Sequence, residues 1–144
     1  MIEFNCRFGD PETQPAMSRL KSELVWLLNA AIDGRLDEME IFFDDRTALT
    51  VMMASRGYPG SYEVGKEVSG FAEVLDAKIV HAGTTLKDGQ VLTSGGRVLG
   101  VTALGKNVRD AQAKAYEAVS KISFGGGAVF RTDIGYRAIG REKN

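Results

Sequence analysis

Apolar and polar residues follow two different periods along this chain, and each period predicts one type of element. In residues 2–8 apolar and polar side chains alternate, as they do in a half-buried strand. The Asp88-Gly89 pair is typical of a two-residue hairpin turn, because such turns need positive φ at both positions. The other strand-like segments are 40–43, 48–54, 78–86, 90–92 and 97–103, with a mixed segment at 68–75.

A first helix is predicted over about residues 11–33, where apolar side chains recur at helical spacing. Asp10 is the expected N-cap, and Pro11 stands at the first helical position, where its missing N–H is tolerated. Gly34 suits the residue after the last turn. Trp26 lies on this helix, and we expect it to serve packing or an interface.

A second helix is predicted over residues 107–122, with Asn107 as its N-cap. Asp110 stands three residues later, where its side chain can bond back to the backbone of the cap residue. Residues 128–139 are expected to be extended or irregular. Helical and strand-like segments do not alternate strictly along the chain. We therefore expect an α+β fold with a mainly antiparallel sheet and two principal helices.

Composition limits the classes of protein to consider. A chain of 144 residues with a net charge of −1 suits one globular domain without a strong field for nucleic acid or anionic membranes. Its one cysteine, Cys6, excludes an intrachain disulfide. No apolar run approaches the roughly 20 residues that cross a bilayer, and the N-terminus lacks a signal-peptide pattern. We expect a cytoplasmic protein that binds neither nucleic acid nor membrane.

Three polar side chains share one face of the predicted opening strand. Glu3, Asn5 and Arg7 are each two residues apart, so they project in the same direction. Carboxylate and amide oxygens suit Mg²⁺, which keeps waters and substrate phosphates as further ligands, and the arginine fork suits phosphate or carboxylate. The simpler interpretation is an ordinary strand with one polar, solvated face.

The segment around these residues resembles the phosphoribosylamine–glycine ligases. Residues 7–14, Arg-Phe-Gly-Asp-Pro-Glu-Thr-Gln, look like the signature octapeptide of that family, and residues 2–5 match what precedes it. The resemblance covers essentially the whole chain. Further segments in the family's order are 19–22, 57–60, 81–84, 95–98, 101–105, 113–116 and 133–137.

This resemblance implies the ATP-grasp architecture and a ligase that joins phosphoribosylamine to glycine while ATP becomes ADP and phosphate, in de novo purine synthesis. Mg²⁺ or Mn²⁺ would bridge the phosphates, with Glu3 and Asn5 as metal ligands. Arg7 would orient the carboxylate or stabilise the acyl phosphate. Residues 1–10 would be the last strand of the ATP-grasp domain, and residues 11–144 the C-terminal domain.

The family's upstream ATP-grasp and N-terminal domains would supply the adenine pocket and the phosphate-binding lysine, which cannot be placed in this sequence. The chain alone is therefore expected to be inactive. Two alternatives stay open. One is the end of another ATP-grasp ligase or carboxylase, since biotin carboxylase-like enzymes share Glu-x-Asn-x-Arg, although residues 10–14 favour the glycine ligase. The other is a free-standing binding module without catalysis.

Two further places are candidate substrate contacts. His81, the single histidine, is a structural residue by the simpler interpretation, while the resemblance allows it a substrate-facing role. Gly95-Gly96-Arg97 could form a backbone nest for phosphate, with Arg97 supplying charge, or could be a tight turn between strands. We take Gly96, Arg97 and His81 as candidate substrate-binding residues.

Overall fold

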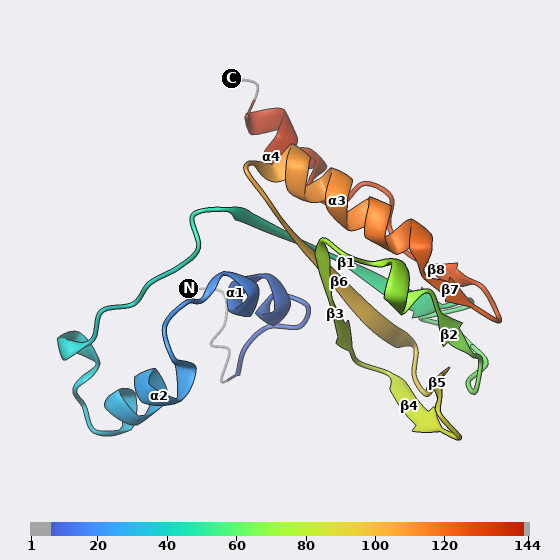
Figure 1. Ribbon diagram of the computed structural model, residues 1–144, viewed down its shortest axis with the longest axis horizontal. Helices are drawn as coiled ribbons and strands as arrows, with labels where there is room; N and C mark the ends of the chain where they lie inside the picture. The colour runs from blue at the N-terminus through green and yellow to red at the C-terminus, as the bar shows by residue number, and fades with distance from the viewer. Residues whose placement is uncertain (1–6, 143–144) are drawn as a thin grey trace.

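The structure is a computed structural model that describes residues 7–142, and its centre is a four-stranded antiparallel sheet (Figure 1). The strand order is β3-β6-β1-β8, so β6 and β1 are the inner strands. Both inner strands are nine residues long and pair along nearly their whole length. The bounds are β1 Thr47–Ser55, β3 Ala77–His81, β6 Arg97–Gly105 and β8 Ala128–Val129.

The core lies between this sheet and α3, Val108–Lys121. Alternate residues of the two inner strands face the helix, and Val51, Leu99 and Val101 have no exposed surface. The helix side of the interface is rich in alanine, which lets the helix lie close to the sheet. Gly105 shows this closeness, because a Cβ there would press on the backbone of Ala111.

The opposite face of the sheet is covered by a short helix, α1, Thr13–Arg19. A Cβ on Gly100 would point to this side, toward Gln14 and Met52. This face is more polar than the other: the hydroxyl groups of Thr50 and Thr102 are 2.7 Å apart and hydrogen-bonded. The α+β class and the mainly antiparallel sheet are thus confirmed.

The predicted hairpin is also confirmed. β4, Thr84–Lys87, pairs with β5, Gln90–Thr93, and both Asp88 and Gly89 have positive φ, 51° and 79°. The prediction of one strand over 78–86 is wrong, because Ala82 and Gly83 interrupt it. The smaller elements are β2 Val68–Ser69, which pairs with β7 Ser123–Phe124, the 3₁₀ turns η1 Leu36–Glu38 and η2 Phe71–Glu73, and α4 Tyr136–Arg141.

The predicted helix over 11–33 is wrong as a single element. It is two helices, α1 and α2, Leu24–Ile32, separated at Leu20. Leu20 is extended and forms a bridge with Phe43, and the Lys21 N–H donates to the Phe42 carbonyl at 2.9 Å. Hydrogen bonds to the returning segment therefore replace those that would have continued the helix. Only this bridge remains of the strand predicted at 40–43.

Of the two predicted helix caps, the structure has one. The Asn107 side chain accepts the Asp110 N–H at 2.9 Å, so the cap of α3 is confirmed. Asp10 is not the cap of α1, which begins after Glu12 without a side-chain cap. The prediction that residues 128–139 are extended or irregular is confirmed for β8 and the residues after it, and is wrong for residues 136–139, which are in α4.

Residues 20–45, called the arm below, leave the sheet and return to it. The arm contains α2 and η1, and in Figure 1 it extends to the left, away from the sheet and α3. Among residues 7–142 no helix combines the length and the apolarity that a membrane crossing would require.

Candidate functional site

The candidate site forms where the octapeptide meets the start of β6. The Arg97 guanidinium lies 2.8 Å from an Asp10 carboxylate oxygen and donates a longer bond, 3.5 Å, to the Asp10 carbonyl. These residues are 87 positions apart in the sequence. Both side chains are partly exposed, so the pair lies at the surface, where a ligand could reach it.

The Gly95-Gly96 turn holds Arg97 in place. The carbonyls of Gly95 and Gly96 accept from the hydroxyl and the N–H of Ser55, at 3.1 and 2.8 Å. A Cβ on Gly83 would meet the backbone of Gly95 and Arg97, so the two turns cross at a distance that only glycine allows. These bound carbonyls fit the tight-turn interpretation, and an anion nest at the amides stays a prediction.

Two tyrosine rings cover the same turn. Tyr58 and Tyr62 lie 6.1 Å apart between ring centroids, and a Cβ on Gly96 would collide with the Tyr58 ring. Both rings remain partly exposed. Gly96 therefore serves close packing against an aromatic side chain, which is a structural reason for glycine at this position.

His81 lies near this turn, at the end of β3. It pairs with Leu99, two residues from Arg97 on β6. Its Nδ1 is 3.0 Å from the Thr84 hydroxyl, and its ring stacks on Phe71 with centroids 5.4 Å apart. Since the ring is exposed as well as supported, the structure is compatible with both interpretations, and its substrate role stays a prediction.

The predicted phosphate-binding face is only partly described. Glu3 and Asn5, the predicted metal ligands, lie outside the described residues. Arg7 is exposed, and its guanidinium donates to the carbonyl of Phe8 at 2.9 Å. Within residues 7–142, no three His, Cys, Asp or Glu side chains gather as metal ligands would. Arg7 is three residues from Asp10, so it belongs to the same segment that pairs with Arg97.

A cavity of about 130 Å³ is lined in part by Ser55, which also bonds the Gly95-Gly96 turn. Arg56 and Lys66 bring positive charge to its wall, and Glu63 brings negative charge. Lys66 bonds Glu63 at 2.7 Å, and this hydrogen bond holds the pKa of the carboxyl below its usual range. One of the two cations is thus already balanced within the cavity.

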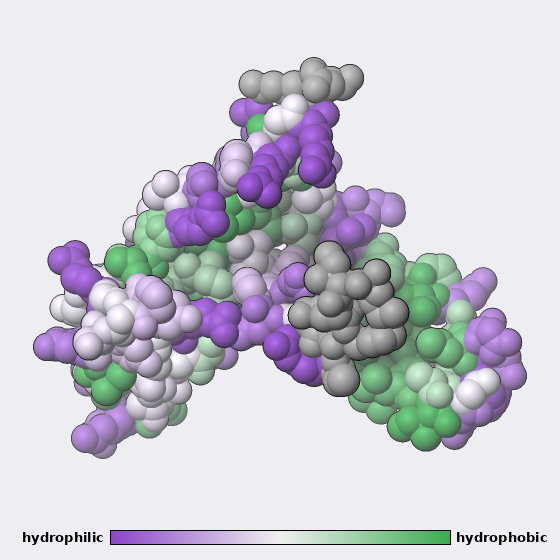
Figure 2. All heavy atoms as spheres, turned by 180° about the vertical axis from the view of Figure 1, so that it is seen from behind, coloured by the Kyte–Doolittle hydropathy of each residue, from purple (hydrophilic) through white to green (hydrophobic). Residues whose placement is uncertain are grey.

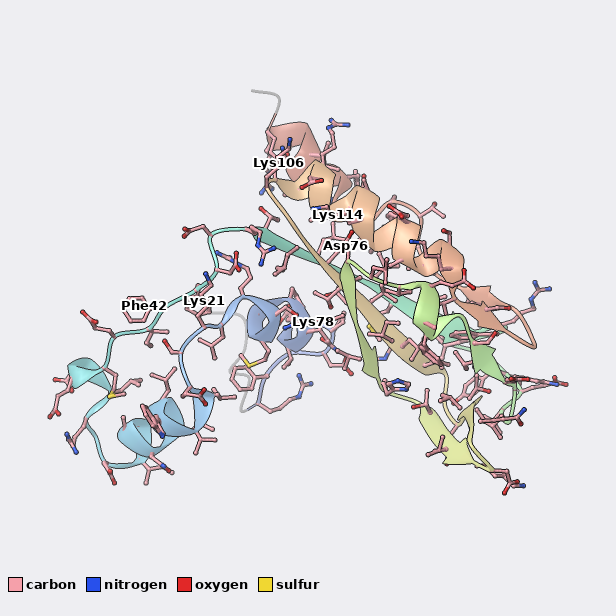
Figure 3. The ribbon with its side chains drawn as sticks, viewed as in Figure 1. Lys21, Phe42, Asp76, Lys78, Lys106 and Lys114 are labelled. Atoms are coloured by element: carbon pink, nitrogen blue, oxygen red, sulfur yellow. The ribbon has the colours of Figure 1, made fainter. Side chains whose placement is uncertain are left out.

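A wider opening of about 280 Å³ lies at the other end of β6, lined in part by Asp76, Lys78 and Lys114 (Figure 3). Lys114 bonds the Asp110 carboxylate at 3.3 Å. Because Thr102 also lines this opening while Arg97 begins the strand, the opening is separate from the candidate site.

Together, these residues offer a partly exposed guanidinium, exposed aromatic rings and rigid backbone turns. A guanidinium recognises carboxylate or phosphate through paired N–H donors, and a tyrosine ring can pack against a sugar or base. Such an anion would bind the Arg97 guanidinium either alongside the Asp10 carboxylate or in its place. The surface therefore offers groups that can bind an anion.

Sequence reasoning missed Tyr58, Tyr62 and the Asp10–Arg97 pair. The motif around Tyr58 was visible at residues 57–60, but contacts between segments so distant in sequence have no periodic signal. In the β4–β5 hairpin, Thr84 lies directly opposite Thr93, two residues before the Gly95-Gly96 turn.

Comparison with known proteins places this α+β domain in a family. Residues 48–137 match the family described as phosphoribosylglycinamide synthetase, C domain. The match covers more than half of the chain, so the chain belongs to this family.

The relatives compared here are phosphoribosylamine–glycine ligases. The chain is 55% identical to the phosphoribosylamine–glycine ligase of Pseudomonas aeruginosa over 99% of its own length and 34% of the ligase's. It is 56% identical to the Salmonella typhimurium ligase over 100% of its length and again 34% of the ligase's. The crystal structure of the Thermotoga maritima ligase superposes with a TM-score of 0.75 and 37% identity, over 93% of this chain and 33% of that one. The chain therefore spans about a third of the length of these relatives.

Proposed function

We propose that this chain provides the substrate-side wall of an ATP-dependent phosphoribosylamine–glycine ligase, an enzyme of purine synthesis. The observation that carries the proposal is the Asp10–Arg97 pair, which joins the family's octapeptide to the Gly95-Gly96 turn of the domain. Two of the segments that resemble the family thereby form one surface.

In this proposal Arg97 and the Gly96 turn bind an anionic part of phosphoribosylamine or glycine, with His81 at the margin. Arg7, on the same segment as Asp10, stabilises charge on the acyl phosphate. Glu3 and Asn5 hold Mg²⁺ or Mn²⁺, whose oxygen preference they match and which would neutralise phosphate charge. In this proposal the adenine pocket lies in the remainder of the enzyme, since this chain corresponds to only 34% of the P. aeruginosa ligase.

The competing proposals keep the same fold. Another ATP-grasp ligase would use a different carboxylate or amine, and a binding module would use the surface without catalysis. The glycine ligase is favoured, because the chain is 55% identical, over 99% of its length, to a phosphoribosylamine–glycine ligase.

A chimeric enzyme tests this function. This chain would replace the matching third of the P. aeruginosa ligase, and ADP release from ATP would be followed with and without glycine and phosphoribosylamine. We expect ADP release that requires both substrates, and none from the isolated chain. Turnover that ignores glycine but accepts another carboxylate would support the other ligases, and a folded but inactive chimera would support the binding module.

Variants of the chimera separate the roles of its arginines. Arg97→Gln should lower kcat/KM by about 10- to 150-fold, because a charged hydrogen bond to substrate is worth about 1.5–3 kcal/mol. Arg7→Gln should instead lower kcat, by roughly 10²- to 10³-fold if it stabilises the transition state. Arg109→Gln, at an exposed arginine in the first turn of α3, is the matched control and should leave both constants unchanged.

A further inference from the structure

The cavity of about 130 Å³ that Ser55 lines combines positive charge with buried polar groups. It lies among the end of β1, the strands β5 and β7, and the glycine loop 125–127 that joins β7 to β8 (Figure 1). The lobe that contains these elements, on the left of Figure 2, is mostly hydrophilic or neutral at its surface as seen from behind. Such surroundings suit a small polar ligand better than an apolar partner.

Arg56 supplies a positive charge that no carboxylate of residues 7–142 balances. Lys66, the second cation of the wall, bonds Glu63 at 2.7 Å, whereas Arg56 takes part in none of the ion pairs of the described residues. Its guanidinium lies against Gly127, where a Cβ would be 3.0 Å from Nε and Nη2. Two cations and one carboxylate therefore leave the cavity wall with a net charge of +1.

The glycine loop brings a backbone donor to the same wall. Gly125 and Gly127 donate their N–H groups to nearby carbonyls at 2.8 and 2.9 Å, which fixes the loop. The N–H of Gly126, between them, has no acceptor within residues 7–142. Gly127 has a φ of 84°, and a Cβ on Gly126 would lie 3.1 Å from the Lys66 side chain. A free N–H in a bent, cation-flanked loop is the kind of group that binds anions.

Two buried hydroxyl groups also line the cavity. Thr93 is 2% exposed and Ser55 is 5% exposed. The Thr93 oxygen accepts the Lys66 N–H at 3.0 Å, but the hydroxyl proton has no acceptor among the described residues. A buried donor without an acceptor costs free energy. A ligand with acceptor oxygens in this cavity would remove that cost.

The size of the cavity and its chemistry limit what it can hold. Sites for drug-sized ligands enclose about 300–1,000 Å³, so 130 Å³ suits an ion or a very small molecule. The groups without a partner are a guanidinium, an N–H and a hydroxyl proton, which are all donors. A guanidinium fork matches the oxygens of phosphate or carboxylate, and donors from three separate segments favour a tetrahedral ion over a planar one.

We propose that this cavity binds a small tetrahedral oxyanion, inorganic phosphate, between the Arg56 guanidinium, the Gly126 N–H and the Thr93 hydroxyl. Arg97 does not line the cavity, so this site is distinct from the candidate substrate site. Ser55 connects the two, because it also bonds the Gly95-Gly96 turn. The bound ion therefore steadies the turn that carries Arg97. The inference concerns groups of this chain alone and does not depend on the proposed function.

NMR of the ¹⁵N-labelled chain during titration with sodium phosphate tests the site, with sodium chloride holding the ionic strength constant. We expect saturable shifts of the amides of Arg56, Thr93 and Gly126, and a downfield shift for Gly126 as its N–H gains an acceptor. Shifts that grow linearly without saturation would mean an adventitious ion only. Saturable shifts confined to the residues around Arg97 would place the anion at the other turn. Either result would overturn the proposal.

Arginine variants locate the bound ion. Arg56→Gln should raise the Kd for phosphate by about tenfold or more, because the charged hydrogen bonds of the guanidinium are lost. Arg109→Gln, at another exposed arginine, is the matched control and should leave the Kd unchanged. The thermal midpoint in chloride alone checks that each variant folds. Unchanged binding by Arg56→Gln, or an equal loss in Arg109→Gln, would contradict the assignment.

A glutamate variant should act in the opposite direction. Glu63→Gln removes a negative charge from the cavity wall and frees Lys66, so phosphate should bind roughly threefold more tightly. Glu38→Gln is the matched control, since Glu38 forms an ion pair of the same i,i+3 spacing with Arg35 on the arm. Weaker or unchanged binding by Glu63→Gln would place the ion outside this cavity.

Competition identifies the kind of anion. Sulfate, which is also tetrahedral, should displace phosphate, whereas acetate should require about tenfold higher concentrations or more. Ribose 5-phosphate should not compete, because the cavity is too small for the sugar. Displacement by acetate at equal concentration would contradict a tetrahedral site. Displacement by ribose 5-phosphate would show that the site takes the phosphate group of a larger ester, which would overturn the assignment to the free ion.

Discussion

Large apolar side chains are buried between the sheet and α3, whereas on the arm they are exposed. In the sheet and α3, Val51, Leu99 and Val101 are fully buried. In the arm, Trp26 and Ile32 are mostly exposed, although α2 is at least as apolar in composition. An amphipathic helix such as α3 buries its apolar face on the sheet and leaves its polar face in solvent. An apolar helix such as α2 must be covered on more than one side to bury its apolar side chains.

This difference indicates which part of the molecule is complete in itself. The body, residues 47–142, contains the buried core between the sheet and α3 and should fold cooperatively without the arm. The arm owes its position to a few hydrogen bonds at its stem, where Lys21 bonds Phe42 and Asp44 bonds Arg19, and its stability should depend on what covers it. Substitutions that are matched between the two regions can therefore break or sharpen the comparison.

The largest contrast is expected from two leucine truncations. Leu99→Ala removes a fully buried side chain and should lower the free energy of unfolding by about 2–5 kcal/mol. Leu28→Ala, at a site 48% exposed on the arm, should change it by about 0.5 kcal/mol or less. Urea denaturation of the isolated chain measures both. Equal losses would show that the arm belongs to the same cooperative unit.

A smaller effect is expected where α3 approaches the sheet. Gly105→Ala would push a Cβ into the backbone of Ala111, and overpacking of this kind costs about 1–3 kcal/mol. Gly140→Ala, in α4, meets nothing within 4 Å and should stabilise by up to about 1 kcal/mol, since alanine favours helix. Thermal unfolding of the two variants tests the sign of each change.

The ion pair at the candidate site should contribute less still. A double-mutant cycle with Asp10→Asn and Arg97→Gln should give a coupling energy of about 0.2–1 kcal/mol, because both side chains are partly exposed. The cycle needs urea denaturation of four proteins. Zero coupling would mean that the octapeptide is not held against β6 in solution.

The smallest effect concerns the arm stem and pH. Hydrogen bonds from Arg46 hold the pKa of Asp44 below its ordinary value of 3.8. The folded pKa is depressed, so this stabilisation is complete above the ordinary value and is lost as pH falls through the lower folded value. NMR amide protection of Lys21 should fall below about pH 4, and Asp44→Asn should remove that dependence. Unchanged protection in the acid range would exclude a role for Asp44 in closing the stem.

Local signals in the sequence predicted the elements that depend on nearby residues. The Asp88-Gly89 hairpin and the Asn107 cap are correct because turn and cap chemistry act within a few positions. The break of the first helix at Leu20 could not be foreseen, because its cause is Phe43, which lies 23 residues further on.

The candidate site shows the same limit. The family resemblance predicted Arg7, Gly96 and Arg97 individually. It did not predict the contacts of Asp10 and Tyr58 that bring these segments together. Asp10 had the appearance of a helix cap, and nothing local indicates a partner as distant as Arg97. Tyr58 likewise packs on Gly96 through the tertiary fold alone.

Hydrogen–deuterium exchange of the isolated chain, resolved by peptide, tests the contrast between body and arm most directly. The account predicts slow exchange for β1, β6 and α3, close to the global unfolding limit, and exchange in α2 that is faster by orders of magnitude. If α2 exchanged as slowly as β6 in the isolated chain, the arm would be stable without a partner, and the central claim would be contradicted.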